Sequence, residues 1–183
     1  MIHLILGGAR SGKSSFAEQW CLDKARADHQ DLVYVATATI TDNEMAQRIE
    51  QHQQQRDKKW QTLECPLELA RCLAKTKDNH LYLNDCLTLW LNNVIYHLGD
   101  EADSEAVQQY TEQLLDALKS AADIQNCSIV LVANEVGLGI VPLGKISRLF
   151  VDHAGWLNQA IAKIADQVTL VTAGIPLTLK SPE

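Results

Sequence analysis

An eight-residue segment near the start of this chain constrains its fold more than any other feature. The residues Gly7, Gly8, Ala9, Arg10, Ser11, Gly12, Lys13 and Ser14 match the pattern GxxxxGK[ST] without a gap, directly after the apolar run Ile2 to Leu6. Glycines in this pattern let backbone N–H groups turn inward around a polyphosphate, which also meets the positive end of the following helix. The sequence therefore predicts a phosphate-binding loop between a buried strand and a helix, with a nucleoside triphosphate as its ligand.

Three side chains are expected to act on the phosphates. Lys13 is expected to reach the β and γ oxygens, and the Ser14 hydroxyl can ligate Mg²⁺. Asp85 ends the apolar run Leu81-Tyr82-Leu83-Asn84, where a phosphate-binding enzyme needs an acid to hold the metal opposite that hydroxyl. An Asp at a strand end is otherwise a common turn residue, and this alternative stays open.

The apolar runs of the chain predict an α/β fold. They are short, apolar and mostly separated by helical patterns, as a parallel sheet flanked by helices requires. Residues Pro176 to Lys180 follow Gly174 and are expected to add a C-terminal β-ribbon with an antiparallel edge strand. We expect one domain over residues 1–183, with strands at Ile2–Leu6, Leu32–Ala36, Leu81–Leu83, Ile129–Ala133 and Val168–Thr172.

Helices are expected between these strands. The first should run from Lys13 to about Ala27, a second should begin near Thr41 and pass His52, and a third should be capped by Asp103 or Ser104. The longest should follow Pro142 and bury an apolar stripe of Leu143, Ile146, Phe150, His153, Leu157, Ile161 and Ile164. Its second stripe, with Arg148, Asp152, Gly155 and Gln159, is either functional or a solvated face.

Charge and cysteine content exclude several classes of protein. The 183 residues carry a net charge of −7, which opposes binding to nucleic acid or to an anionic membrane surface. No apolar stretch approaches the length of a membrane span. The five cysteines form no CxxC pair, so a disulfide framework or a zinc site is not expected, and a reducing cytoplasm fits better.

A second constellation suggests covalent chemistry. Arg48, His52 and Arg56 have i, i+4 and i+8 spacing, which would place an imidazole between two guanidinium groups on one side of a helix. A neutral imidazole is a competent nucleophile toward phosphorus, and the arginines would bind the phosphate oxygens. A lone histidine on a helix is more often a surface residue, so the spacing alone favours a solvated helix over covalent chemistry.

Two further segments are expected near the ligand. Trp60, Thr62 and Glu64 alternate as in a short strand, so Glu64 could meet a base or ribose, although an exposed edge strand explains the pattern as well. The segment from Asn134 to Pro142 follows an apolar strand, and open α/β sheets bind ligands at the carboxyl ends of their strands. We therefore expect this loop to help form a site.

Together these motifs resemble the bifunctional adenosylcobinamide kinase / adenosylcobinamide-phosphate guanylyltransferase family of cobalamin biosynthesis. The resemblance covers almost the whole chain and rests most specifically on RIEQHQQQR from Arg48 and NEVGLGIVP from Asn134. It also includes GGARSGKS, Ala36-Thr37-Ala38, WQTLECP, LNDCLTLWLNN, Arg148 with Asp152 and Gly155, and AGIPLTLK.

The resemblance implies specific roles. His52 would accept GMP, while Gly7 to Ser14, Ala36, Thr37, Ala38, Gln53, Gln54, Gln55, Arg56, Glu64 and Asp85 would bind nucleotide. It implies ATP and GTP as substrates used with Mg²⁺, adenosylcobinamide and its phosphate as acceptors, and a homotrimer with a RecA-like core.

Two other functions remain open at this point. A plain small-molecule kinase with the same phosphate-binding loop would form no covalent nucleotide. A non-enzymatic regulatory switch would bind nucleotide and ignore corrinoids.

Overall fold

The computed structural model describes residues 1–39 and 59–181, and its core is a seven-stranded sheet with the order β3-β2-β4-β5-β1-β6-β7. Every strand pair is parallel except β6 with β7, which is antiparallel. The strands are β1 (Ile2–Gly7), β2 (Asp31–Ala36), β3 (Gln61–Glu64), β4 (His80–Asp85), β5 (Ser128–Asn134), β6 (Gln167–Thr172) and β7 (Ile175–Lys180). The predicted α/β sheet with an antiparallel edge strand is confirmed, and the order places β5 between β1 and β4.

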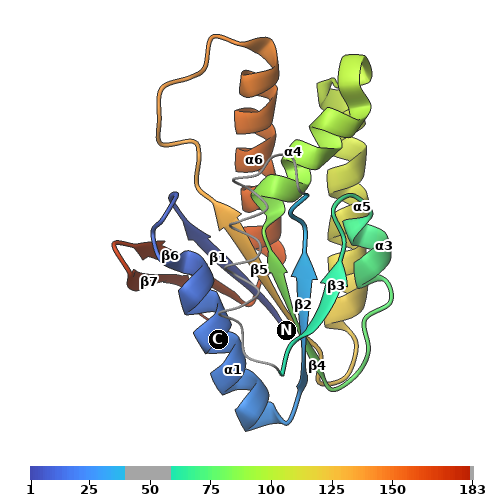
Figure 1. Ribbon diagram of the computed structural model, residues 1–183, viewed down its shortest axis with the longest axis vertical. Coiled ribbons are helices and arrows are strands. Elements are labelled where there is room, and N and C mark those ends of the chain that lie inside the picture. The colour runs from blue at the N-terminus through green and yellow to red at the C-terminus, as the bar shows by residue number, and fades with distance from the viewer. Residues whose placement is uncertain (40–58, 182–183) are drawn as a thin grey trace.

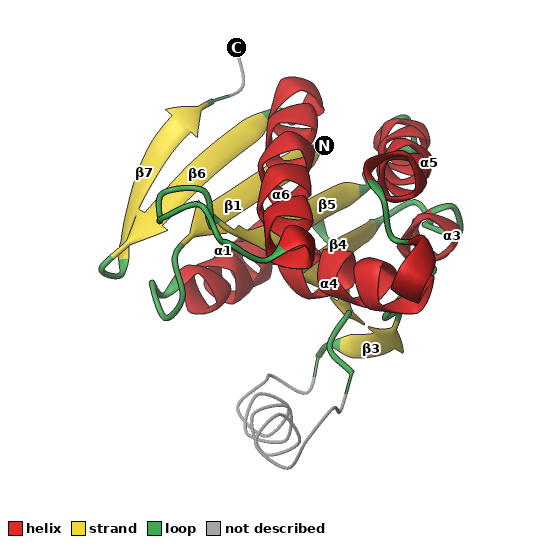
Figure 2. Ribbon diagram, turned by 90° about the horizontal axis from the view of Figure 1, so that it is seen from above, coloured by secondary structure: helices red, strands yellow, loops and turns green. Residues whose placement is uncertain are grey.

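Helices cover both faces of this sheet (Figures 1 and 2). Helix α1 packs on one face, where its Ala17, Cys21 and Ala25 are buried. The other helices bury their apolar sides on the opposite face, in a larger cluster that includes Trp90 and Leu114. The helices are α1 (Lys13–Asp28), α3 (Leu69–Leu73), α4 (Leu87–Leu98), α5 (Ser104–Ala122) and α6 (Lys145–Ile164), with the short 3-10 helix η1 (Gly99–Glu101) after α4.

The helix boundaries mostly follow the sequence signals. Helix α1 begins at Lys13 as predicted, and the Asp103 carboxylate caps α5 by accepting a hydrogen bond of 2.8 Å from the backbone N–H of Ala106. The helix predicted near Thr41 lies outside the described residues. Among the described helices, none is long and apolar enough to span a bilayer.

One prediction about α6 was wrong. Its apolar stripe was expected to be buried from Leu143 onward, but Leu143 is 97% exposed and Ile146 is 50% exposed. Burial begins further along, at His153, Leu157 and Ile161. The start of α6 rises beyond the carboxyl ends of the strands, so it has no sheet to pack against (Figure 1).

Candidate nucleotide site

The backbone of the GxxxxGKS segment forms a tight loop between β1 and α1. The Ser11 N–H donates to the Gly8 carbonyl over 3.2 Å, and Gly12 has a φ of 92°, a conformation that favours glycine. At Gly7 a side chain is excluded, because an added Cβ would lie 2.5 Å from the Val171 carbonyl oxygen. Glycine is therefore required at these two positions by the backbone of the loop and by its packing against β6.

Lys13 and Asp85 both place a charge near Cys86, the residue that follows β4. The Lys13 side chain is buried, and its Nζ donates to the Gly8 carbonyl over 3.1 Å. Burial and the negative charge of Asp85 raise the pKa of the Cys86 thiol to about 11, although the positive charge of Lys13 acts in the opposite direction. The ammonium of the loop and the carboxylate at the end of β4 thus both face the surroundings of Cys86.

The strand register explains how distant segments reach one edge of the sheet. Gly7 pairs with Asn134, and Asp85 pairs with Ala36, which in turn pairs with Glu64. Because these strands are parallel, their carboxyl ends lie together, which is where open α/β sheets bind ligands. The structure therefore brings together most of the predicted nucleotide-binding residues that it describes.

Tyr34 orients the predicted metal-binding acid. Its hydroxyl donates to Asp85 Oδ2 over 3.1 Å, and its ring lies edge-on to Trp60 with the ring centroids 6.0 Å apart. Sequence analysis did not single out Tyr34, although it lies two residues before Ala36 on the same strand. The hydrogen bond fixes the orientation of the Asp85 carboxylate at the end of β4.

Thr37 has a different environment from its neighbours Ala36 and Ala38. It is fully buried, and its hydroxyl donates to the Cys86 carbonyl and accepts from the Cys86 N–H, both at 2.8 Å. The Thr37 side chain therefore fastens the end of β2 to the chain that leaves β4. Its hydroxyl is fully engaged inside the protein.

The strand predicted around Glu64 is confirmed as β3, and it is an edge strand. All its residues are exposed, including Thr62 and Glu64, whereas Trp60 just before it is buried. The exposed carboxylate of Glu64 is available to a ligand. The other predicted residues of this part of the chain, Arg48, His52, Gln53, Gln54, Gln55 and Arg56, lie outside the described residues.

Asn134, the last residue of β5, lies beside the start of the phosphate-binding loop, because it pairs with Gly7. It ends the strand between β1 and β4, and its Oδ1 is buried without a hydrogen-bond partner among the described residues. Its N–H donates to the Thr88 hydroxyl over 2.7 Å, which ties β5 to the start of α4. The sequence signal was the polar residue directly after an apolar strand.

The second stripe of α6 is a solvated face. Asp152 and Gln159 are exposed, and Arg148 donates to the carbonyls of Pro142 and Leu143 in the preceding loop. On the buried side, His153 Nε2 lies 3.0 Å from the Ser104 hydroxyl, and burial lowers the pKa of this imidazole. His153 is thus a packing residue, as predicted.

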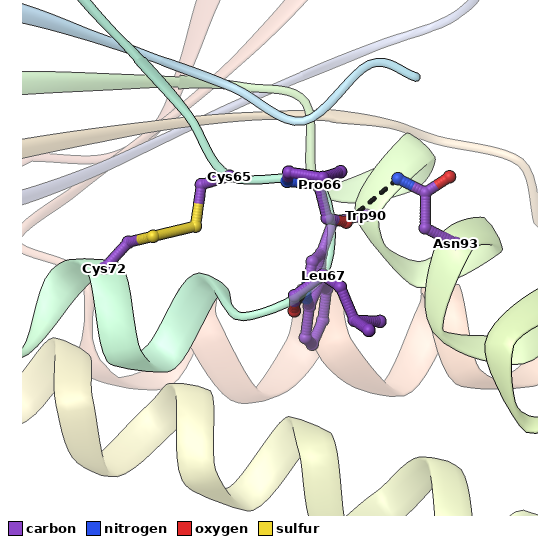
Figure 3. The surroundings of a disulfide bond; sticks show 6 residues. All are labelled: Cys65, Pro66, Leu67, Cys72, Trp90 and Asn93. Atoms are coloured by element: carbon purple, nitrogen blue, oxygen red, sulfur yellow. Dashed lines mark hydrogen bonds between the residues drawn. A yellow bond between two sulfur atoms is a disulfide. The ribbon is translucent and has the colours of Figure 1, made fainter. Parts of the chain in front are cut away.

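The cysteine prediction was wrong for one pair. Cys65 and Cys72 form a disulfide, with their Cα atoms 6.7 Å apart (Figure 3). Cys21, Cys86 and Cys127 are buried free thiols. The pair forms because the chain turns at Pro66 and Leu67 and enters α3, which returns alongside the end of β3. An odd cysteine count without CxxC spacing does not reveal such a turn.

Known proteins of similar sequence match this chain over almost its full length. It is 45% identical to the bifunctional adenosylcobalamin biosynthesis protein CobP of Pseudomonas aeruginosa over 98% of both chains. It is also 38% identical to the bifunctional adenosylcobalamin biosynthesis protein CobU of Escherichia coli and to that of Salmonella typhimurium. Both matches cover 98% of this chain and all of the CobU chain.

Matches to solved structures are more distant. A KaiC-like protein of Pyrococcus horikoshii is 16% identical with a TM-score of 0.46, covering 92% of this chain and 69% of its own. The flagellar accessory protein FlaH of Methanocaldococcus jannaschii is 11% identical with a TM-score of 0.49, covering 99% and 78%. The family model for cobinamide kinase / cobinamide phosphate guanyltransferase matches residues 3–179, and this chain belongs to that family.

Proposed function

We propose that this protein catalyses two successive reactions at one nucleotide site. In the first, ATP or GTP phosphorylates the aminopropanol hydroxyl of adenosylcobinamide. In the second, GMP is transferred from GTP to the resulting adenosylcobinamide phosphate, which gives adenosylcobinamide-GDP and pyrophosphate. The observation that carries the proposal is that the phosphate-binding loop after β1 and the Asp85 end of β4 lie at the same edge of the parallel sheet, in a chain that matches the family over residues 3–179.

In the phosphorylation step, the substrate hydroxyl oxygen bonds to the γ-phosphorus as the bond from that phosphorus to the β-bridging oxygen breaks. The nucleoside diphosphate leaves, and the hydroxyl proton passes to a base, for which Asp85 and Glu64 are the candidates. The backbone N–H groups of the loop and the Lys13 ammonium stabilise charge on the phosphate oxygens. Lys13 is already held over the loop by its bond to Gly8.

The described residues fit Mg²⁺ as an ion shared with the phosphates. Ser14 supplies a hydroxyl and Asp85 a carboxylate, which are oxygen ligands of the kind this ion prefers. Phosphate and water oxygens would complete the coordination of such an ion, and it would neutralise phosphate charge.

In the guanylyl step, we propose His52 as the nucleophile. An imidazole nitrogen bonds to the α-phosphorus of GTP while the bond to the β-bridging oxygen breaks, and pyrophosphate leaves. An oxygen of the corrinoid phosphate then bonds to the same phosphorus, the nitrogen–phosphorus bond breaks, and the imidazole is regenerated. One difficult displacement becomes two easier ones. Arg48 and Arg56 would bind the phosphate oxygens, and Gln53, Gln54 and Gln55 the rest of the nucleotide.

We also propose that the protein works in the cytoplasm as a homotrimer that binds no nucleic acid. The net charge of −7 supports the last point. Leu138, Ile140 and Leu143 after β5 are 88%, 98% and 97% exposed in the single chain. Exposed apolar side chains that cluster in one loop are typical of surfaces buried in an assembly, which supports the trimer.

The deciding experiment uses GTP labelled at the α-phosphate. The wild-type protein should acquire acid-labile label, and His52→Asn should acquire none while still phosphorylating adenosylcobinamide. His97→Asn, at an exposed position on α4, is the matched control and should label like wild type. A wild-type protein that phosphorylates the corrinoid without ever carrying label would be a plain kinase, and label on His52→Asn would assign the nucleophile elsewhere.

A further inference from the structure

Asn93 on α4 connects three separate parts of the chain through its side-chain amide. Its Nδ2 donates to the Thr37 carbonyl over 2.8 Å and to the Pro66 carbonyl over 2.9 Å. Its Oδ1 accepts from the Thr39 hydroxyl over 3.4 Å. Both N–H donors and the oxygen of the amide are therefore used, each by a different residue (Figure 3 shows the bond to Pro66).

The segments joined by Asn93 both carry predicted nucleotide-binding residues. Thr37 lies in the Ala36-Thr37-Ala38 end of β2, and Pro66 lies two residues after Glu64. The segments also meet directly, because the Cys65 N–H donates to the Ala36 carbonyl over 2.8 Å. Asn93 extends this contact beyond the end of the strand pair, where the ladder between β2 and β3 has stopped.

The turn after β3 has two further attachments to the body of the protein. Trp90 lies one helical turn before Asn93, and its Nε1 donates to the Leu67 carbonyl over 2.8 Å. The disulfide joins Cys65 to Cys72 of α3. Figure 3 shows these residues around the turn. Asn93 is distinct from Trp90 and the disulfide, because it alone among these attachments also reaches the end of β2.

We infer that Asn93 is a positioning residue for the bound nucleotide: it fixes the distance between the Ala36–Ala38 strand end and the turn that carries Glu64. This inference rests on the proposed function, since it assumes that both segments contact the nucleotide. Loss of the amide donors would let these segments separate while the phosphate-binding loop, on β1 and α1, keeps its geometry. The effect should therefore fall on nucleotide binding and leave phosphoryl transfer from bound nucleotide intact.

The test compares Asn93→Asp with Asn92→Asp. The aspartate at position 93 keeps the shape of the side chain but has no donor for the two carbonyls, and Asn92 is an exposed neighbour on the same helix, where the same substitution controls for added charge. Asn93→Ser removes both bonds without adding a charge, and it serves in place of Asn93→Asp if that variant does not fold. The measurements are the Kd for GTP without corrinoid, the KM and kcat of phosphorylation, and the Tm.

Loss of two hydrogen bonds at a binding site should weaken GTP binding roughly tenfold or more. We expect Asn93→Asp or Asn93→Ser to raise the Kd and the KM for GTP by that factor, with kcat and the KM for the corrinoid within about twofold of wild type, and Asn92→Asp to match wild type. An unchanged Kd for GTP, or a loss of kcat equal to the rise in KM, would overturn the inference. Failure of the wild-type protein to bind GTP would instead refute the proposed function.

Discussion

His3 should make the stability of this protein depend on pH below neutrality. The residue lies on β1 and is 0% exposed. Its Nε2 is 2.9 Å from the Thr169 hydroxyl, its ring lies 4.5 Å from that of Trp20, and its Nδ1 has no hydrogen-bond partner among the described residues. Burial lowers the pKa of this imidazole from 6.5 to about 4.

The sign of the effect follows from the protons bound in each state. Between about pH 6.5 and pH 4 the unfolded chain binds a proton at His3 and the folded protein does not, so stability is fully present above this window and falls as the pH falls. The full shift of the His3 pKa corresponds to about 3 kcal/mol in the free energy of unfolding. Of this, about 2.5 kcal/mol should be lost between pH 7 and about pH 4.5.

Denaturant unfolding of wild type and His3→Gln at these two pH values measures this loss. The glutamine amide can still hydrogen-bond to Thr169 and does not titrate, so the variant should lose about 2.5 kcal/mol less than wild type on acidification. Any destabilisation common to both pH values cancels in this comparison. His97→Gln, at an exposed position, should lose as much stability on acidification as wild type does. Equal losses in wild type and His3→Gln would show that the protein accommodates a protonated His3.

The site itself supports two more predictions. Lys13→Ala should lower both phosphoryl and guanylyl transfer at least about 100-fold, because the ammonium stabilises phosphate charge in either reaction; full activity in one assay would show that the reactions use separate sites. Asp85→Asn should raise the Mg²⁺ concentration needed for half-maximal phosphorylation while the Kd for nucleotide without metal changes little, because the amide keeps the shape and loses the charge. An unchanged Mg²⁺ titration would reduce Asp85 to a structural partner of Tyr34.

The elements that the sequence predicted well are those with local signals. The GxxxxGKS pattern defines its own turn and the start of α1, and continuous apolar runs marked each buried strand. Parallel pairing then places the carboxyl ends of the strands together. This is why Asp85 could be predicted as a site residue before its neighbours in space were known. The same logic predicts a role for the loop from Asn134 to Pro142, which stays a prediction.

Predictions failed where the outcome depends on contacts with parts of the chain that are distant in sequence. Leu143 and Ile146 continue the apolar spacing of α6, but spacing cannot show that the sheet ends before it reaches them. Tyr34 and Asn93 act through hydrogen bonds to residues that are distant in sequence, and neither has a local pattern that predicts its partner. The placement of His52 stays a prediction, because it lies outside the described residues.

The edge strand β3 shows why polar and covalent bonds matter around this site. All of its residues are exposed, so hydrophobic burial contributes little to holding it in place. Its attachments include the ladder to β2, the disulfide from Cys65 and the bond from Asn93 to Pro66. A segment held in this way can present Glu64 to a ligand at a fixed position without a hydrophobic face of its own. Hydrophobic periodicity could therefore indicate the strand but not what fastens it, and the residues that fasten it are the ones that sequence analysis missed.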